Sequence, residues 1–234
     1  MQDDWTFPLV FQLADIDLSG ILYWFGNFIY LCMAVCAIYG LYCIIALMRR
    51  VSQKSFPSRD ASDAFLDDIG EMMEKNDFEG IKETCDTPEL WSRAVPQLVH
   101  VAVENRHKPI KKIRQIVADF FSREILAEFD ARTAWVNTIV KSAPMLGLLG
   151  TVTGMIAAFG KIAGSGESGV KPSALASDIS FALWTTTGGL AIAIPLVILS
   201  NITTTRISQL QDAVDENLDI FYDDLEAAQT RGDG

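Results

Sequence analysis

Three successive threonines stand in an otherwise apolar stretch of this chain, where hydroxyl groups can do chemistry that aliphatic side chains cannot. The stretch reads ALWTTTGGLAIAIP over residues 182–195. A threonine hydroxyl can relay hydrogen bonds and hold water, but it cannot store a proton near neutral pH. Proton transfer through hydrocarbon needs a titratable group near the middle of the membrane. The apolar stretches contain no carboxylate, so if this chain serves proton transfer, the carboxylate must come from another polypeptide.

On a helix, the three threonine hydroxyls point in different directions and therefore have different expected environments. Three successive helical residues spread over about 200° of the circumference, so at least one of them faces away from lipid. Thr186 shares its stripe with small residues, which suits a close partner helix or a pore lining; these are Ala182, Gly189 and Ala193. For Thr185 and Thr187, a silent hydrogen bond to the carbonyl one turn back is about equally favoured.

A second apolar stretch is rich in glycine, in the string APMLGLLGTVTGM over residues 143–155. Gly150 and Gly154 form a GxxxG pair, and Gly147 lies one turn earlier. Small residues at this spacing let helix backbones approach closely in lipid. We therefore expect these three glycines to pack against another helix.

Other classes of site have weak support. His100 and His107 lack the HExxH spacing of a zinc enzyme, and no CxxC pair occurs among the four cysteines. An enzyme is therefore the least favoured class, and no cofactor is expected. The net charge of −11 and the absence of a concentrated basic surface argue against a nucleic acid partner.

Three uncharged apolar blocks must position these residues. They cover 21–48, about 142–160 and about 179–202. About 20 residues of helix cross a bilayer, and a buried helix of a soluble protein rarely stays uncharged for so long. The sequence thus predicts an all-α membrane protein with three transmembrane helices, long cytoplasmic helical extensions and a cytoplasmic helical domain.

Charges near the first block predict the orientation. Acidic residues alone precede the block, whereas Arg49, Arg50 and Lys54 directly follow it. Positive residues remain on the cytoplasmic side, so the N-terminus is expected outside and the C-terminus in the cytoplasm. In a bacterium this corresponds to the inner membrane with a periplasmic N-terminus.

The segments between and after the blocks have helical patterns. Thr87 and Pro88 are expected to begin a short helix, and a helix that starts after Pro109 can continue into the second span. Beyond the third span, apolar residues recur every three or four positions: Ile207, Leu210, Val214, Leu218, Phe221 and Leu225. This seam fits either packing on the chain's own cytoplasmic domain or self-association, and the two alternatives are equally favoured.

The predicted organisation has seven segments. They are an external N-terminal segment (1–20), transmembrane helix 1 (21–48), the cytoplasmic helical domain (49–133), transmembrane helix 2 (134–162), a short external loop (163–176), transmembrane helix 3 (177–203) and a cytoplasmic C-terminal helix (204–234).

The two strings APMLGLLGTVTGM and ALWTTTGGLAIAIP, in the second and third spans, resemble the MotA/TolQ/ExbB proton channel family. The resemblance is greatest to its three-span ExbB and TolQ branch. It implies a homopentamer in which the second and third helices line a pore, with Thr151 and Thr186 at the family's two pore-threonine positions. It also implies a dimer of a single-span ExbD or TolR type partner that supplies an intramembrane aspartate.

One position departs from the pattern of that branch. ExbB and TolQ carry a glutamate in the third span where this chain has Phe181. Asp178, about one turn earlier, either replaces it from the external end of the pore or is a solvated helix start, with the second alternative slightly favoured.

The leading hypothesis is a pore-forming stator subunit of a motor driven by the proton motive force, which energises transport or envelope processes. A TonB-like or TolA-like effector and membrane lipid are further expected partners, and the coupling ion is H⁺ or Na⁺. The competing hypothesis is a membrane scaffold that assembles a complex without conducting ions.

The charge asymmetry gives a testable topology. A cysteine at Ser19 should react with a membrane-impermeant maleimide added outside intact cells, whereas a cysteine at Ser55 should react only after lysis. Gel-shift labelling measures both, and the reverse pattern would overturn the orientation.

Overall fold

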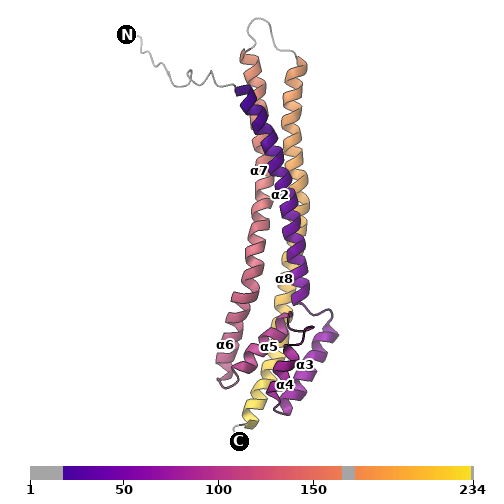
Figure 1. The fold of residues 1–234 in the computed structure, drawn as a ribbon, viewed down its shortest axis with the longest axis vertical. Coiled ribbons are helices and arrows are strands. Elements are labelled where there is room, and N and C mark those ends of the chain that lie inside the picture. The colour runs from indigo at the N-terminus through magenta and orange to yellow at the C-terminus, as the bar shows by residue number, and fades with distance from the viewer. Residues whose placement is uncertain (1–17, 165–171, 233–234) are drawn as a thin grey trace, which may run out of the picture. The chain divides into compact units, whose positions relative to one another are not determined.

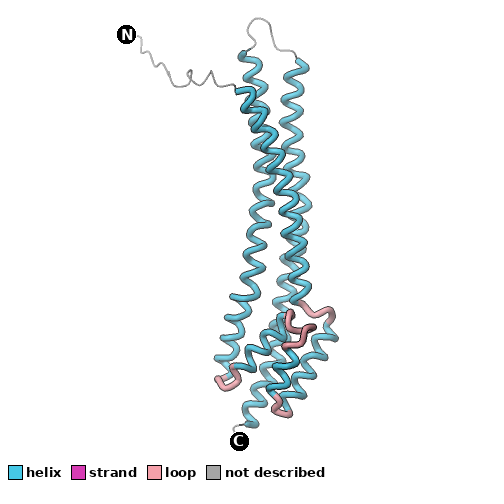
Figure 2. Tube along the Cα trace, in the orientation of Figure 1, coloured by secondary structure: helices cyan, strands magenta, loops and turns pink. Residues whose placement is uncertain are grey.

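The computed structural model describes residues 18–164 and 172–232, and in these ranges it contains helices and turns without a strand (Figure 1 and Figure 2). The helices are α2 (Leu18–Lys54), α3 (Arg59–Glu74), α4 (Phe78–Cys85), α5 (Ala94–Glu104), α6 (Ile110–Phe120), the π-helical turn η1 (Phe121–Leu126), α7 (Ala127–Gly164) and α8 (Pro172–Gly232). The all-α fold is as predicted.

Three helices are long and apolar enough to cross a membrane, within the described residues. They comprise Gly26–Lys54, Ile110–Ala163 and Pro172–Thr230. The prediction of three spans is therefore confirmed. Helix ends differ slightly from the expected boundaries, because α2 starts at Leu18 and α8 at Pro172. Most of the predicted external segment and loop lies outside the described residues, and the membrane boundaries stay a prediction.

The chain divides into two compact units. One unit comprises residues up to Leu41 together with Asn137–Val197, and the other comprises Tyr42–Val136 with Ile198–Gly234. In the first unit α7 and α8 pack closely, and α2 contacts both of them at Gly40. A Cβ atom added to Gly40 would lie 2.9 Å from Leu196 Cδ1 of α8 and 3.2 Å from Ile139 Cγ2 of α7.

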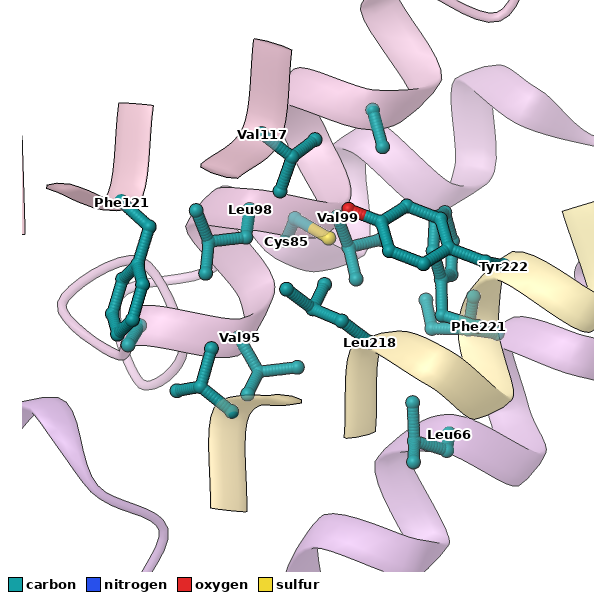
Figure 3. Packing of buried hydrophobic residues seen from close by; sticks show 14 of the residues in the cluster. Leu66, Cys85, Val95, Leu98, Val99, Val117, Phe121, Leu218, Phe221 and Tyr222 are labelled. Carbon is teal, nitrogen blue, oxygen red and sulfur yellow. The ribbon is translucent and has the colours of Figure 1, made fainter. Parts of the chain in front are cut away.

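The second unit has an ordinary hydrophobic core (Figure 3). Helix α8 contributes one stripe to it: Leu210, Val214, Leu218, Phe221 and Leu225 are buried, and Ile207 packs against the cluster. Facing them are residues such as Leu98 and Val117, both with no exposed surface. The C-terminal seam therefore packs on its own domain, as the first of the two alternatives expected. Apolar periodicity alone could not distinguish these outcomes, because both bury the same stripe.

Polar contacts fix the register of α3 in this core. The Ser58 side chain accepts a hydrogen bond from the backbone N–H of Ala61 at 3.2 Å and so caps the helix. Farther along, the buried Ser62 hydroxyl donates to Asn217 Oδ1 of α8 at 2.9 Å. A buried hydroxyl left without a partner would be costly, so this pair favours one alignment of the two helices.

The segment after α4 differs from the prediction. Thr87 accepts backbone hydrogen bonds from Leu90 and Trp91, but only a single turn forms, and the next helix starts at Ala94. The expected helix start at Thr87 and Pro88 was therefore wrong. Pro96 fits the new start, since a proline in the first helical turn lacks only an N–H that the helix does not use.

A continuous helical path from Ile110 into the second span was expected and is present, with a π-helical turn that was not foreseen. Buried residues recur there at steps of four: Ile113, Val117, Phe121, Ile125 and Phe129. In an α-helix each step of four drifts by about 40°, so four steps would move the stripe by about 160°. A π-turn is wider than an α-turn and returns the stripe to the core.

Burial makes Cys85 a test of this core. It is 2% exposed, and burial, with a smaller contribution from Asp86, raises the pKa of its thiol to about 12. Since the thiolate is the reactive form, Cys85 should resist maleimide at pH 8 in the folded protein and react after denaturation, as peptide mass spectrometry would show. A cysteine at the exposed Ser122 is the control and should react at once; equal rates at both sites would contradict this packing.

Candidate functional site

The glycines of α7 lie directly against α8 of the same chain. A Cβ added at Gly147 would be 2.8 Å from the carbonyl oxygen of Thr185, and one at Gly154 would be 2.7 Å from Ala182 Cβ. At Gly150 the added atom would overlap the side chain of Thr185. These distances are shorter than any real Cβ contact, so the two backbones approach as closely as glycine allows. The close packing expected of the three glycines is present, with α8 as the neighbouring helix.

Helix α8 meets this surface with its own small residues. Gly189 lies against Ala143, whose carbonyl oxygen would be 2.7 Å from an added Cβ. The buried stripe of α8 is Ala182, Thr185, Gly189, Ala193 and Leu196. Ala182 and Gly189 thus occupy the contact with α7 in a single chain, and Ala193 is buried on the same stripe. The structure places Thr185 among them, with no exposed surface, and puts Thr186 beside the stripe.

Sequence reasoning had assigned Thr186 to the small-residue stripe and did not single out Thr185. Both fit a helical pattern, because Thr185 is three residues after Ala182 and Thr186 is three residues before Gly189. Gly150 of α7 decides which of the two threonines is buried, because the Thr185 side chain fills the space opposite it. A signal was available in the spacing of α7, where Gly147, Gly150 and Gly154 alternate steps of three and four, as do Ala182, Thr185 and Gly189.

The threonine hydroxyls satisfy backbone carbonyls in two ways. Thr186 donates across the contact to the Gly147 carbonyl at 3.1 Å. Thr185 lies 3.1 Å from the same carbonyl but 2.7 Å from Ala182 in its own helix. A hydroxyl has one proton to donate. Thr185 can therefore donate to the Ala182 carbonyl of α8, while Thr186 donates to the Gly147 carbonyl of α7. Thr187 is exposed and donates to the Leu183 carbonyl one turn back at 3.0 Å. This is the hydrogen bond within its own helix that was one of the two expected alternatives.

Thr151 lies on the opposing helix, α7. It is one helical turn beyond Gly147, whose carbonyl accepts the Thr186 hydroxyl, and its own hydroxyl donates to the Leu148 carbonyl at 2.7 Å. Both threonines are partly exposed at the margin of the contact between α7 and α8. Each of the two predicted pore threonines thus has its hydroxyl proton already bonded to a carbonyl, and their place at a pore stays a prediction.

Asp178 does not lie at a helix start. It is in the second turn of α8, where its carboxylate pairs with Lys161 of α7, with Nζ 2.7 Å from Oδ2 and 2.8 Å from Oδ1. The side chain of Asp178 is 19% exposed and that of Lys161 is 50% exposed. This ion pair joins α7 and α8 at the end of their glycine contact, where the backbone oxygen of Asp178 would lie 3.3 Å from a Cβ added at Gly154.

Phe181 turns toward α2. Its ring packs edge-on against Tyr30, with 5.2 Å between centroids and an interplanar angle of 82°. An added Cβ at Gly26 would lie 3.2 Å from Phe181 Cζ. The aromatic side chain therefore joins the third span to the first through an apolar contact.

The other faces of α7 and α8 are apolar and exposed. On α7 they carry Met145, Leu148, Val152, Met155, Ile156 and Phe159; on α8 they carry Leu183, Trp184, Leu190 and Ile194. Among the described residues no group of three His, Cys, Asp or Glu side chains is placed to hold a metal ion. The threonines and the pair of Lys161 with Asp178 are polar features of this unit, together with residues such as Lys141.

Comparison with known proteins identifies the family. The family model of the MotA/TolQ/ExbB proton channel family matches residues 91–216, which is more than half of the chain and includes the whole contact between α7 and α8. The chain belongs to the MotA/TolQ/ExbB proton channel family. It is accordingly an ExbB-like membrane protein of a channel family rather than of an enzyme family, and the resemblance of its second and third spans is confirmed.

Three relatives illustrate the similarity. A putative biopolymer transport protein ExbB homolog of Methanothermobacter thermautotrophicus is 28% identical over 180 residues, or 75% of this chain and 60% of the relative. A putative biopolymer transport protein ExbB-like 1 of Synechocystis is 38% identical over 37% of this chain and 36% of the relative. The biopolymer transport protein exbB1 of Vibrio cholerae is 35% identical over 39% of this chain and 40% of the relative. The aligned parts thus cover at most about three fifths of these MotA/TolQ/ExbB family members.

The glycine contact of this family member predicts a sharp difference between two alanine variants. Gly150→Ala forces Cβ into Thr185, whereas Gly160→Ala meets nothing within 4 Å. Overpacking of this kind costs about 1–3 kcal/mol. Gly150→Ala should therefore lower the midpoint of thermal unfolding of the detergent-purified protein by several degrees, while Gly160→Ala leaves it unchanged. Equal midpoints for the two variants would show that α7 and α8 do not meet at Gly150.

Proposed function

We propose that this chain is the pore-forming stator subunit of a motor driven by the proton motive force. In this proposal it assembles as a homopentamer in a bacterial inner membrane, with the N-terminus in the periplasm and the C-terminus in the cytoplasm. A dimer of single-span ExbD or TolR type subunits occupies the pore and supplies an intramembrane aspartate. Membership of a proton channel family supports the class of function.

The observation that carries the proposal is the threonine pair at the margin of the contact between α7 and α8. Thr186 donates to the Gly147 carbonyl, and Thr151 follows Gly147 by one helical turn on α7. In a ring of such chains this arrangement repeats a band of hydroxyls about one helical turn deep. Hydroxyl oxygens keep acceptor capacity after donating their proton, so the band can hold water or a protonated carboxylic acid.

The titratable group that carries the proton belongs to the partner. Residues 179–202 and 142–160 have no charged side chain, and Asp178 is engaged by Lys161. Proton entry from outside neutralises the partner aspartate, which then moves relative to the threonine band and releases its proton on the inside. The membrane potential contributes about 2.3 kcal/mol per charge per 100 mV, enough to bias each step.

Exposed apolar faces on both helices support assembly. The residues that line them, such as Leu148 and Leu183, are more than half exposed in the single chain. In a bilayer such faces are covered by lipid or by neighbouring helices, and the pentamer divides them between the two. In this proposal the work is coupled to a TonB-like or TolA-like effector, with H⁺ as the coupling ion and Na⁺ as the alternative.

A non-conducting scaffold is the second candidate. The observation that favours it is Phe181, which packs on Tyr30 at the position where the ExbB and TolQ branch has a glutamate. A scaffold needs the glycine contact and the apolar faces, but it has no use for the threonine hydroxyls.

The double variant Thr151→Val and Thr186→Val separates the two candidates. Valine keeps the shape of threonine and removes the hydroxyl, and an intramembrane hydrogen bond contributes only about 0.6 kcal/mol on average. The variant should therefore assemble with its partner at normal stoichiometry, yet lose most of its proton flux in reconstituted vesicles that contain a pH-sensitive dye.

Thr187→Val is the matched control, because this exposed threonine bonds only within α8. It should leave the flux unchanged. Normal flux in the double variant would refute the role of Thr151 and Thr186, and assembly without flux in the wild-type complex would establish the scaffold.

A further inference from the structure

The second unit contains a cavity of about 950 Å³ that the proposed function does not use. Its walls come from the end of α2, the turn that follows, the start of α3, the start of α5 and one face of α8. Four basic side chains line it: Lys54, Arg59, Arg93 and Arg206. The serines at 52, 55 and 58 also line it, so hydroxyl donors accompany the positive charges.

Three acidic side chains also line the cavity, namely Asp63 of α3 and Asp212 and Glu216 of α8. Arg206 lies four residues beyond Ile202, the last residue of the uncharged third block, or about 6 Å at 1.5 Å per residue. The acidic residues Asp212 and Glu216 lie about 15 and 21 Å beyond Ile202 on the same scale. Glu216 is compensated by Arg59, with 3.9 Å between Oε2 and NH2. Positive charge is therefore concentrated at the end of the cavity nearest the apolar block.

Two of the basic side chains are held in place by neutral acceptors. Lys54 Nζ donates to Gln97 Oε1 at 2.8 Å, and Arg93 NH1 donates to the backbone carbonyl of Ser55 at 2.6 Å. Arg93 also stacks on Phe56, 5.1 Å from the ring centroid. Arg93 has no acidic partner among the described residues, and Arg206 is exposed without an ion pair in the same part of the chain. The charge of Lys54 is partly balanced by the nearby carboxylate of Glu128. Two cationic groups thus face the cavity with their charge uncompensated, and a third with its charge partly balanced.

Apolar helix faces lead into this basic end. On α8, Ile198 and Ile202 are 55% and 43% exposed and precede Arg206 at steps of four, which places all three on one face. On α2, the half-exposed Ile45 precedes Arg49 by one turn, and Ser52 follows at the next. Both helices therefore present an exposed aliphatic surface that ends in basic and hydroxyl groups. A soluble anion would contact only the basic and hydroxyl groups, whereas a lipid would contact these with its headgroup and the aliphatic surface with its acyl chains.

We propose that this cavity binds the phosphate group of an anionic phospholipid from the leaflet at that end of the spans. The acyl chains lie along Ile45, Ile198 and Ile202, while Lys54, Arg93 and Arg206 surround the phosphate. Asp212 and Glu216 lie farther along α8 than Arg206, and together with Asp63 of α3 they provide a polar lining for the rest of the headgroup. The site is independent of the threonines, so it does not rest on the proposed pore.

The test uses the full chain reconstituted in nanodiscs of equal phosphatidylglycerol and phosphatidylcholine, followed by native mass spectrometry of the lipids that remain bound. The wild type should retain phosphatidylglycerol in preference to phosphatidylcholine. Each basic residue near a membrane surface strengthens the attraction for anionic lipid by about fivefold, so Arg206→Gln should lower this preference by roughly that factor. Arg206→Lys keeps the charge and should restore it.

Lys111→Gln is the matched control, because Lys111 is an exposed cation on α6 outside the cavity. It should leave the lipid preference unchanged. An equal loss in this control, or no loss in Arg206→Gln, would overturn the site. Displacement of the lipid by excess inorganic phosphate would assign the cavity to a free anion instead. A change in the mass of the oligomer without a change in bound lipid would assign it to a contact between copies, and either result would refute the proposal.

Discussion

The approach of α7 to α8 over glycine is the constraint on which the membrane part of this molecule depends. Lipid tails are as apolar as leucine, so helices in a bilayer gain little from burying apolar surface and associate through packing and interhelical hydrogen bonds. Here Gly147, Gly150 and Gly154 let the two backbones meet. That approach in turn brings the Thr186 hydroxyl within 3.1 Å of the Gly147 carbonyl. A single added methyl group would separate the helices and break this bond.

Much of the fold could be predicted from the sequence because uncharged length and helical periodicity are strong signals. The three spans followed from charge-free blocks, and the seam from Ile207 to Leu225 followed from its spacing. The side on which that seam packs could not be predicted, since a stripe is buried equally well by the same chain or by another. The π-helical turn at Phe121–Leu126 was also missed, because steps of four look helical although they drift on an α-helix.

At the candidate site, too, the pattern of one helix could not show which single residue faces the neighbouring helix. The pattern around residues 182–193 predicted a small-residue stripe, but a helix face is wide enough to admit either Thr185 or Thr186. The choice depends on the opposing helix, where Gly150 leaves space for Thr185 alone. Thr186 is thereby displaced to the margin, partly exposed. The position of Thr186 at the margin therefore depends on the shape of α7, not on the stripe of small residues in α8, and a pore at that margin stays a prediction.

The direction of the hydrogen bonds at this margin limits what the threonines can recognise. Thr151 and Thr186 have each given their only hydroxyl proton to a carbonyl, at 2.7 Å and 3.1 Å respectively. Their remaining capacity is to accept, which matches water or a protonated carboxylic acid and offers nothing to an ionised carboxylate. To bind the ionised form, a hydroxyl must turn away from its carbonyl and leave that acceptor without the bond. If the carboxyl group of the proposed partner meets these two residues, they favour its neutral state, and their affinity for it falls when its proton leaves.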